Sequence, residues 1–405
     1  MSNIAFLFDE PVTSGGGFQQ SISFLIRFLE GSTRKDKYFV FSTNSYLTRY
    51  IARYVSSKDV TIIAIRRDYL TILTSAILNT KLVHNILKNA RVRYSGYYDS
   101  LLHRYKIDLL IFLSPSLIAR SIGSCNFIIP VWDLDYRLNN EFPEVSWHGE
   151  FGYRQSYYSS VLVRAYRVIV ESELSKKLIM QYFGIDENRI IKVNFVPSEL
   201  IKEGSDTLTE DVFQKYSLEN KYIFYPAQFW PHKNHVYIIK ALHILTQDYH
   251  INLGAVFCGS DRGMLGKINE MVTAAGLENN VKLLGFVSGT DLVALYKNAL
   301  AVVMPAYMGF SNLPPIEAVY WGIPVFYSDL PQFHEQMGDS VIYVDLKNPA
   351  DLANKIQRLI ADKEFQRDVA ERMLKKRASL ECDSTMNLVF QALNDYDSIA
   401  ECWRL

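Results

Sequence analysis

The stretch that decides the fold is Met304–Asp329, M-P-A-Y-M-G-F-S-N-L-P-P-I-E-A-V-Y-W-G-I-P-V-F-Y-S-D. The apolar run Ala299–Met304 before it and Val325–Ser328 near its end have the length and composition of buried strands. Between them, a Gly, Ser and Asn turn leads into a helix that starts at the pair Pro314–Pro315 and ends at Gly322. The stretch therefore predicts a unit of strand, helix and strand.

The loop at the start of this predicted helix has the chemistry of a phosphate site. Backbone N–H groups and the helix dipole both favour an anion there. Glu317 lies about one turn into the helix, where its carboxylate can accept two hydrogen bonds from the vicinal diol of a ribose. One element could therefore hold both ends of a nucleotide diphosphate. The alternative is an ordinary α/β connection with a solvated Glu317.

The run G-F-S-N-L-P-P-I-E-A…W-G-I-P-V resembles the nucleotide-sugar motif of the retaining glycosyltransferases of family 4 (glycosyl transferases group 1), which have the GT-B fold. That family usually has two glutamates with seven residues between them. The second matches Glu317, whereas the first falls on Gly309 and is missing. The resemblance implies that the donor is bound by Gly309, Phe310, Ser311, Asn312, Leu313 and Glu317.

Bulk properties limit the class of protein. The 405 residues are 49% hydrophobic and 21% charged, which predicts a globular chain of two or three domains. A net charge of zero leads us to expect no nucleic-acid partner. Four scattered cysteines without metal-ligand spacing predict reduced thiols in a cytoplasmic protein. The N-terminus lacks a basic signal region, and no apolar run reaches the ~18 residues of a membrane span.

Strands and helices alternate along both halves of the chain, which is typical of parallel sheets. In the first half we expect the strands Ile4–Phe8, Tyr38–Ser42, Val60–Ile65, Asp108–Leu113, Phe127–Val131, Val168–Glu171 and Ile190–Phe195. In the second half we expect Tyr222–Tyr225, Leu253–Phe257, Val281–Leu284 and Val341–Val344 besides the two strands above. Helices are expected between them, including Tyr46–Val55 and one that Ser172 caps.

The pattern predicts an α/β fold of two doubly wound, Rossmann-like domains facing a cleft. We expect an N-terminal acceptor-binding domain at 1–197 and a C-terminal nucleotide-sugar-binding domain at 210–380. A polar linker is expected at Pro197–Thr209. In the fold resembled, the last helix crosses back, so 381–405 is expected to pack on the first domain.

A glycine-rich loop and a strand end are the candidate sites of the first half. Gly16 and Gly17 follow the first strand, and in the family resembled such a loop lies in the cleft near the donor phosphate or the acceptor. The alternative is a flexible turn. The run V-W-D-L-D-Y-R-L at 131–138 follows another strand, at the edge where ligands bind in open α/β sheets. We assign catalysis to Asp133 and acceptor contacts to Asp135, Tyr136 and Arg137.

Those carboxylates could equally cap a helix or pair with Arg137. The segment Arg66–Lys106 is also ambiguous. It carries eight cations against two acidic residues, with apolar residues at helical spacing. Such a segment predicts peripheral contact with anionic lipid, but it could bind a pyrophosphate on the acceptor or be a solvated face over a core.

The loop at 226–235, P-A-Q-F-W-P-H-K-N-H, is the second candidate donor site. Lys233 is unfavourable at a helix N-terminus unless an anion neutralises it. In the family resembled a basic pair here clamps the diphosphate; Lys233 matches one member, and Gln228 stands where arginine is common. We place Gln228, His232 and Lys233 in the donor site and assign catalysis to Lys233. His232 and His235 lack further ligands nearby, so no metal is expected.

The predicted function is a retaining glycosyltransferase that moves a sugar from a nucleotide-diphosphate donor to a glycan or lipid-linked oligosaccharide. Its expected place is bacterial surface-polysaccharide synthesis (O-antigen or capsule) at the inner face of the membrane. Lys233, the loop N–H groups and the helix dipole would stabilise the departing diphosphate, so no cofactor is expected. Retention follows from the resemblance alone. The alternatives are a sugar-nucleotide hydrolase or epimerase on the same fold and a non-catalytic partner of a transferase.

Overall fold

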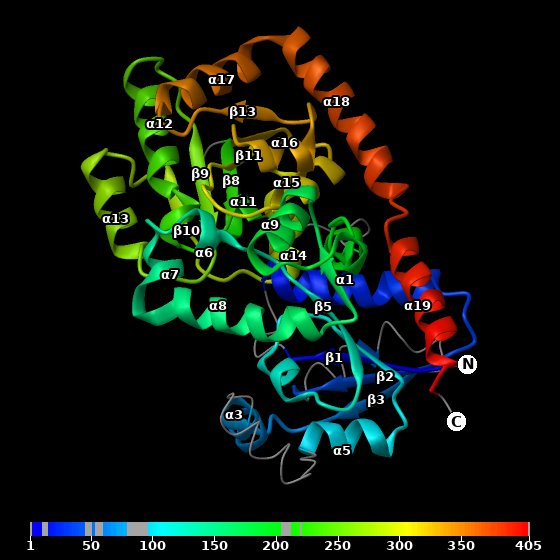
Figure 1. Ribbon diagram of the computed structural model, residues 1–405. Helices are drawn as coiled ribbons and strands as arrows, with labels where there is room; N and C mark the ends of the chain where they lie inside the picture. Colours follow the sequence, from blue (N-terminus) through cyan, green and yellow to red (C-terminus); the bar gives the residue numbers. More distant parts are fainter. Residues whose placement is uncertain are drawn as a thin grey trace. The chain divides into compact units, whose positions relative to one another are not determined.

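The computed structural model of the chain describes residues 2–9, 15–44, 51–52, 60–78, 96–203, 212–218 and 221–403. They form two compact units, each with a parallel sheet and a hydrophobic core of its own (Figure 1). Unit 1 comprises Met1–Leu134, Phe151–Asn194 and Ser384–Leu405; unit 2 comprises Asp135–Glu150 and Phe195–Asp383. The predicted α/β class with two parallel sheets is confirmed.

The sheet of unit 1 has seven strands within the described residues, in the order β3-β2-β1-β4-β5-β6-β7. Their bounds are β1 Asn3–Phe8, β2 Lys37–Ser42, β3 Val60–Ala64, β4 Leu109–Phe112, β5 Asn126–Pro130, β6 Arg167–Val170 and β7 Ile190–Lys192. Central β1 pairs in parallel with β2 and β4, with Ile4 opposite Tyr38 and Leu109. Apolar runs such as β1 and β4 become central strands because helices can cover both of their faces.

The helices of unit 1 are α1 Gly16–Gly31, α3 Tyr69–Leu78, α5 Tyr97–Arg104, α8 Glu150–Val161, α9 Glu173–Phe183 and α19 Met386–Ala400. Short 3₁₀ turns are η1 Leu117–Ser121, η3 Leu162–Arg164 and η4 Glu187–Arg189. Ser172 caps α9 as predicted, because its Oγ accepts the N–H of Ser175 at 3.0 Å. Of the predicted helix Tyr46–Val55, only 51–52 lie within the described residues, and residues 79–95 of the basic segment lie outside them.

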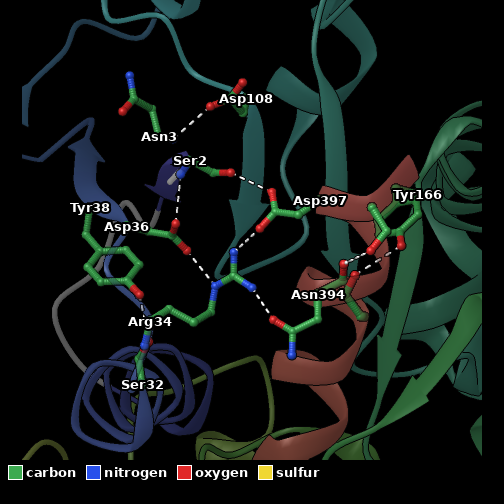
Figure 2. Close-up of polar contacts among 12 residues, drawn as sticks. Ser2, Asn3, Ser32, Arg34, Asp36, Tyr38, Asp108, Tyr166, Asn394 and Asp397 are labelled. Carbon is green, nitrogen blue, oxygen red and sulfur yellow. Dashed lines mark hydrogen bonds and ion pairs between the residues drawn. The ribbon is translucent and has the colours of Figure 1, made fainter. Parts of the chain in front are cut away.

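The C-terminal helix α19 returns to unit 1 and lies beside α1 (Figure 1). Polar groups join it to the start of the chain (Figure 2). The Arg34 guanidinium bonds to Asp36 at 2.5 Å and to Asn394 and Asp397 of α19. The Ser2 hydroxyl also donates to Asp397, at 2.5 Å. The end of the chain is therefore fixed to the edge of the sheet where β1 begins.

Unit 2 contains a parallel sheet with six strands among its described residues, in the order β10-β9-β8-β11-β12-β13. Their bounds are β8 Tyr222–Pro226, β9 Gly254–Cys258, β10 Val281–Leu283, β11 Ala301–Met304, β12 Val325–Ser328 and β13 Ile342–Val344. The longer helices are α12 His235–Gln247, α13 Leu265–Ala274, α14 Gly289–Lys297, α15 Leu313–Tyr320, α16 Pro331–Met337, α17 Pro349–Ala361 and α18 Lys363–Glu381. The shorter ones are α6 Asp135–Leu138, α7 Pro143–Ser146, η2 Trp147–Gly149, α10 Glu199–Glu203, α11 Val212–Lys215 and η5 Pro231–Lys233.

The structure differs from the predictions in unit 2 at three places. Within the predicted linker Pro197–Thr209, Glu199–Glu203 form α10, and residues 204–209 lie outside the described residues. The sequence H-E-Q-M-G-D at His334–Asp339 indicates a turn, but its residues up to Met337 are the end of α16. Pro331 starts this helix, and Gly338 ends it with φ 59°. The segment Asp135–Glu150 groups with unit 2, although it falls inside the predicted domain 1–197. In the part of the chain that the structure describes, no helix is both long and apolar enough to cross a membrane.

Candidate functional site

The candidate site lies where the strand order of unit 2 reverses. β8 pairs with β9 on one side and with β11 on the other, so the connections leave it in opposite directions. Ligands of open α/β sheets bind beyond the carboxyl ends of the strands at such a point. The loops that follow β8 and β11 are the two that the sequence singled out for a donor.

A tight turn places Lys233 at the N-terminus of α12. Lys233 ends η5, and Asn234, which precedes α12, adopts a left-handed conformation with φ 54°. The buried Tyr225 hydroxyl donates to the Lys233 carbonyl at 2.9 Å. The Lys233 Nζ donates to the Asn312 Oδ1 at 3.4 Å. The structure thus brings together one residue from each predicted donor loop.

The loop before α15 offers backbone donors. The N–H groups of Phe310, Ser311 and Leu313 have no hydrogen-bond partner among the described residues. The expectation of free N–H groups is wrong at two neighbours: Gly309 donates to Asp135 Oδ2 at 3.0 Å, and Asn312 donates to a side chain of α16 at 3.1 Å. The remaining three N–H groups point to an anion site at the start of α15.

Gly309 is a steric requirement of this loop. Its φ is 112°, and a Cβ there would lie 2.7 Å from Nδ2 and 3.0 Å from Oδ1 of Asn312. Any side chain would therefore displace the amide that contacts Lys233. This backbone conformation does not accommodate the glutamate that the family usually has at the position of Gly309.

Glu317 is buried and engaged inside unit 2. Its side chain is on α15, its residue is 6% exposed, and its two oxygens accept the hydroxyls of Ser198 at 2.7 Å and Tyr296 at 2.9 Å. Burial raises the pKa of Glu317, while these two hydrogen bonds act in the opposite direction. The predicted solvated alternative is wrong. Each oxygen of Glu317 already accepts one hydrogen bond. Because a carboxylate oxygen can accept two, each could still accept one from a ribose hydroxyl.

The side chain of Gln228 is bonded to its own loop and to the loop after β9. Its Oε1 accepts the indole N–H of Trp230 at 2.9 Å, and its Nε2 donates to Ser260 Oγ at 3.0 Å. Its amide stabilises the loop and adds no positive charge. His235 is packed among aromatic rings, and burial, aided by the charge of Lys233, lowers its pKa to about 3. His235 is therefore a neutral core residue.

The segment Asp135–Glu150 touches both loops. Asp135 on α6 is buried, accepts the Gly309 N–H and also accepts the side-chain amide of Asn139 at 3.1 Å. Glu144 on α7 accepts the backbone N–H of His232 at 3.0 Å and lies 2.6 Å from His232 Nδ1. The sequence analysis missed Glu144, because its partner lies 88 residues away. The only local signal was an acidic residue in the first turn after Pro143.

The predicted acceptor residues are dispersed. Asp133 forms an ion pair with Arg154 at 3.0 Å in unit 1. Asp135 serves the Gly309 loop of unit 2, as described above. The Tyr136 ring is completely buried, which argues against an acceptor contact, and the Arg137 guanidinium lies 5.9 Å from the centre of that ring.

Of the predicted glycine loop of unit 1, residues 10–14 lie outside the described residues, and Gly17 is closely packed. α1 begins at Gly16, and a Cβ on Gly17 would lie 2.7 Å from the ring of Trp132. At the strand-order reversal of unit 1, between β1 and β4, the carboxylate of Asp9 accepts three hydrogen bonds. The donors are Arg67 at 2.6 Å, Thr43 at 2.9 Å and Ser116 at 2.5 Å.

Comparisons with known proteins agree with the geometry of unit 2. Residues 209–376 match the family described as glycosyl transferases group 1. The chain is 28% identical over 290 residues to the O-antigen chain mannosyltransferase RfbU of Salmonella typhimurium (strain LT2), which covers 71% of this chain and 76% of RfbU. It is 22% identical over 278 residues to the serotype-specific mannosyltransferase WbdA of Escherichia coli, which covers 67% of this chain and only 33% of WbdA.

A solved structure shows the same fold over 98% of this chain. The crystal structure of Anabaena Alr3699/HepE in complex with UDP and glucose matches with a TM-score of 0.65 at 16% identity, covering 98% of this chain and 100% of that one. This likeness confirms the predicted GT-B fold.

Proposed function

We propose that this chain, whose residues 209–376 match the glycosyl transferases group 1, is a glycosyltransferase that moves mannose from a nucleoside-diphosphate donor to a growing surface glycan. The observation that carries the proposal is the convergence of Lys233 with the unpartnered N–H groups before α15 at the strand-order reversal of unit 2. The proposed sugar and the O-antigen context come from the names of two relatives. RfbU is an O-antigen chain mannosyltransferase, and WbdA is a serotype-specific mannosyltransferase.

The chemical problem of such a transfer is the negative charge on the departing diphosphate. Lys233 and the N–H groups of Phe310, Ser311 and Leu313 supply donors that are fixed before the reaction. Preorganised donors of this kind stabilise charge as it develops, so they raise the rate more than the affinity. No metal is part of this proposal.

Glu317 is the proposed ribose contact. The hydroxyls of Ser198 and Tyr296 donate to its two oxygens and fix the position of the carboxylate before a ribose diol binds. We assign retention of the anomeric configuration to a front-face attack assisted by the leaving phosphate, because we identify no carboxylate pair suited to double displacement among the residues that the structure describes.

A thermal-shift panel tests the donor site. UDP, GDP, ADP, CMP and dTDP, with their sugar conjugates, are added without metal. A ligand at ~100 times its Kd should raise the free energy of unfolding by about 2.7 kcal/mol. We expect a shift with one base, and Glu317→Ala should weaken that binding about ten- to a hundred-fold through the lost charge-assisted bonds.

Glu278→Ala, which removes an exposed carboxylate of the same unit, is the matched control and should leave the shift unchanged. The melting temperature without ligand shows whether Glu317→Ala still folds; Glu317→Gln, which keeps the shape, is the substitute if it does not. The absence of a shift with every nucleotide would contradict the proposal and favour a non-catalytic partner of a transferase.

A second proposed property is contact with the inner face of the membrane, where a lipid-linked acceptor would be found. The start of α3 exposes three large apolar side chains, Tyr69 at 69%, Leu70 at 70% and Leu73 at 64%, next to exposed Arg66. Apolar side chains beside cations suit an anionic lipid surface.

Sedimentation with vesicles tests this contact. The wild type should bind vesicles of phosphatidylglycerol more than vesicles of phosphatidylcholine, and Leu70→Glu with Leu73→Glu should abolish the binding. Leu374→Glu on α18, whose side chain is 63% exposed, is the matched control. Equal sedimentation of both variants would rule out α3 as the contact.

A further inference from the structure

Asn312 lies at the N-cap position of α15, yet its side chain does not cap the helix. A capping side chain accepts the N–H of the second or third helical residue. Those residues are Pro314 and Pro315, which have no N–H. The side-chain amide makes other contacts instead: its Oδ1 accepts from Lys233 Nζ at 3.4 Å, and its Nδ2 donates to the Tyr327 hydroxyl at 2.8 Å. Asn312 thus joins the start of α15 to the lysine of the other donor loop.

The side-chain amide of Gln336, on α16, holds both backbone polar groups of Asn312. Its Oε1 accepts the Asn312 N–H at 3.1 Å, and its Nε2 donates to the Asn312 carbonyl at 2.6 Å. Two such bonds fix an orientation, because a rotation of either group bends or breaks one of them. The sequence analysis missed this contact, because the two residues are 24 positions apart and the run around Gln336 indicated a turn.

These two bonds also determine the direction of the Leu313 N–H, which has no partner among the described residues. The Asn312 carbonyl and the Leu313 N–H belong to one peptide group, which is planar and trans. In such a group the C=O and the N–H point in opposite directions. Because Gln336 holds the carbonyl, the Leu313 N–H is fixed and points away from the Gln336 amide. Among the first three residues of α15, only Leu313 has an N–H, because the next two are prolines.

Tyr327 stabilises this arrangement from β12. Its side chain is completely buried, its ring stacks on Phe333 with 4.1 Å between the centres, and its hydroxyl donates to Gln336 Oε1 at 3.0 Å. Burial raises the pKa of Tyr327 well above its ordinary value, so the hydroxyl keeps the proton that it donates. The same oxygen accepts the Asn312 amide. Asn312, Tyr327 and Gln336 are therefore bonded to one another within unit 2.

We propose that Gln336 is a positioning residue of the donor site, which acts through the peptide group of Asn312 and Leu313 and directs the Leu313 N–H toward the departing diphosphate. Tyr327 supports it by orienting both side-chain amides. The inference rests on the proposed function, because it names residues that set the geometry of the same site. A misdirected N–H weakens the interaction with charge that develops on the leaving group more than it weakens the binding of the whole donor.

Calorimetric titration tests this role with GDP, UDP, ADP and dTDP, each paired with a sugar conjugate (GDP-mannose, UDP-glucose, ADP-glucose and dTDP-glucose). The free diphosphate carries the terminal charge that the leaving group develops during transfer, whereas the conjugate does not. The ratio of the two affinities therefore isolates the contribution of donors to that charge. Gln336→Leu should lower this ratio about ten-fold, the loss of one charge-assisted hydrogen bond, and change the affinity for the conjugate less than about three-fold. Tyr327→Phe should lower the ratio less, because Gln336 keeps its own bonds to Asn312.

Gln336→Glu separates positioning from folding. At about pH 8 the introduced carboxylate accepts the Asn312 N–H but repels the Asn312 carbonyl, so the variant should behave like Gln336→Leu. At about pH 5 a carboxylic acid offers the same donor and acceptor as the amide, so the ratio should return toward that of the wild type at the same pH. The carbonyl beside it disfavours the charged form, which brings the recovery into this pH range. A general loss of folding would give no such recovery.

Gln332→Leu is the matched control and should keep the ratio of the wild type, since this glutamine of the same helix has no side-chain hydrogen bond among the described residues. The melting temperature of each variant shows whether it folds, and Gln336→Glu at the two pH values carries the test if Gln336→Leu does not. An unchanged ratio in the Gln336 variants, or an equal loss for diphosphate and conjugate, would overturn this inference and leave the donor site standing. No nucleotide binding by the wild type would overturn the proposed function, and this inference with it.

Discussion

The two strand-order reversals of the molecule are built alike and used differently. In unit 1, at β1 and β4, the Asp9 carboxylate is fully engaged by Arg67, Thr43 and Ser116. In unit 2, at β8 and β11, the loops bring a cation, an amide and three unpartnered N–H groups together. A network whose donors and acceptors are bonded to one another stabilises the fold. Donors without a protein partner can instead bind an anionic ligand.

The largest expected effect lies in unit 2. Lys233→Met removes the charge but keeps the apolar stem, and we expect donor turnover to fall about 100- to 1,000-fold, the range seen when one donor to a developing anion is lost. Nucleotide release assays measure the rate. Lys240→Met, an exposed lysine on the same helix, should turn over like the wild type. A similar loss in both variants would mean that the helix, not the charge, was affected.

The next effect belongs to unit 1. Asp9→Ala should lower the free energy of unfolding by about 3 kcal/mol, the low end for breaking a buried pair, since the Arg67 side chain remains 30% exposed. Urea denaturation gives the value. Asp395→Ala removes a surface pair with Arg167 at 4.0 Å and should change stability by less than about 1 kcal/mol. If Asp9→Ala unfolds no more easily than Asp395→Ala, the network of unit 1 is not structural.

The smallest expected effect concerns His235, which is buried among aromatic rings of unit 2. The pKa of His235 is about 3 in the folded chain against an ordinary value of 6.5, so the unfolded state binds the proton first as pH falls. Stability from this residue is present above pH 6.5 and declines between 6.5 and 3. At pH 5 the loss is about 2 kcal/mol.

His235→Phe should remove that decline, so its stability advantage over the wild type should grow from pH 7 to pH 5. Urea denaturation at both values measures it. An identical pH dependence of His235→Phe and the wild type would show that His235 is not buried neutral.

The sequence predicted the secondary-structure elements better than the contacts between distant segments. Ser172 caps α9 as expected, and Ser288 caps α14 in the same way, because capping is decided by residues within one turn. The end of α16 was missed, because the histidine-to-aspartate run resembles a turn until Pro331 is recognised as a helix start. In the site, Lys233 and the loop of Gly309 were found because dipoles and turn chemistry are local.

By itself, then, the sequence determined the order of strands and helices, the α/β class and the two loops that could hold a diphosphate. Only the tertiary structure decided that Asp135–Glu150 packs with unit 2, that Glu144 meets His232 and that Glu317 is buried beneath Ser198 and Tyr296. The physical reason is the distance along the sequence over which each interaction acts. Propensity, capping and hydrophobic period act over a few residues, whereas burial and pairing depend on which distant segments share one core.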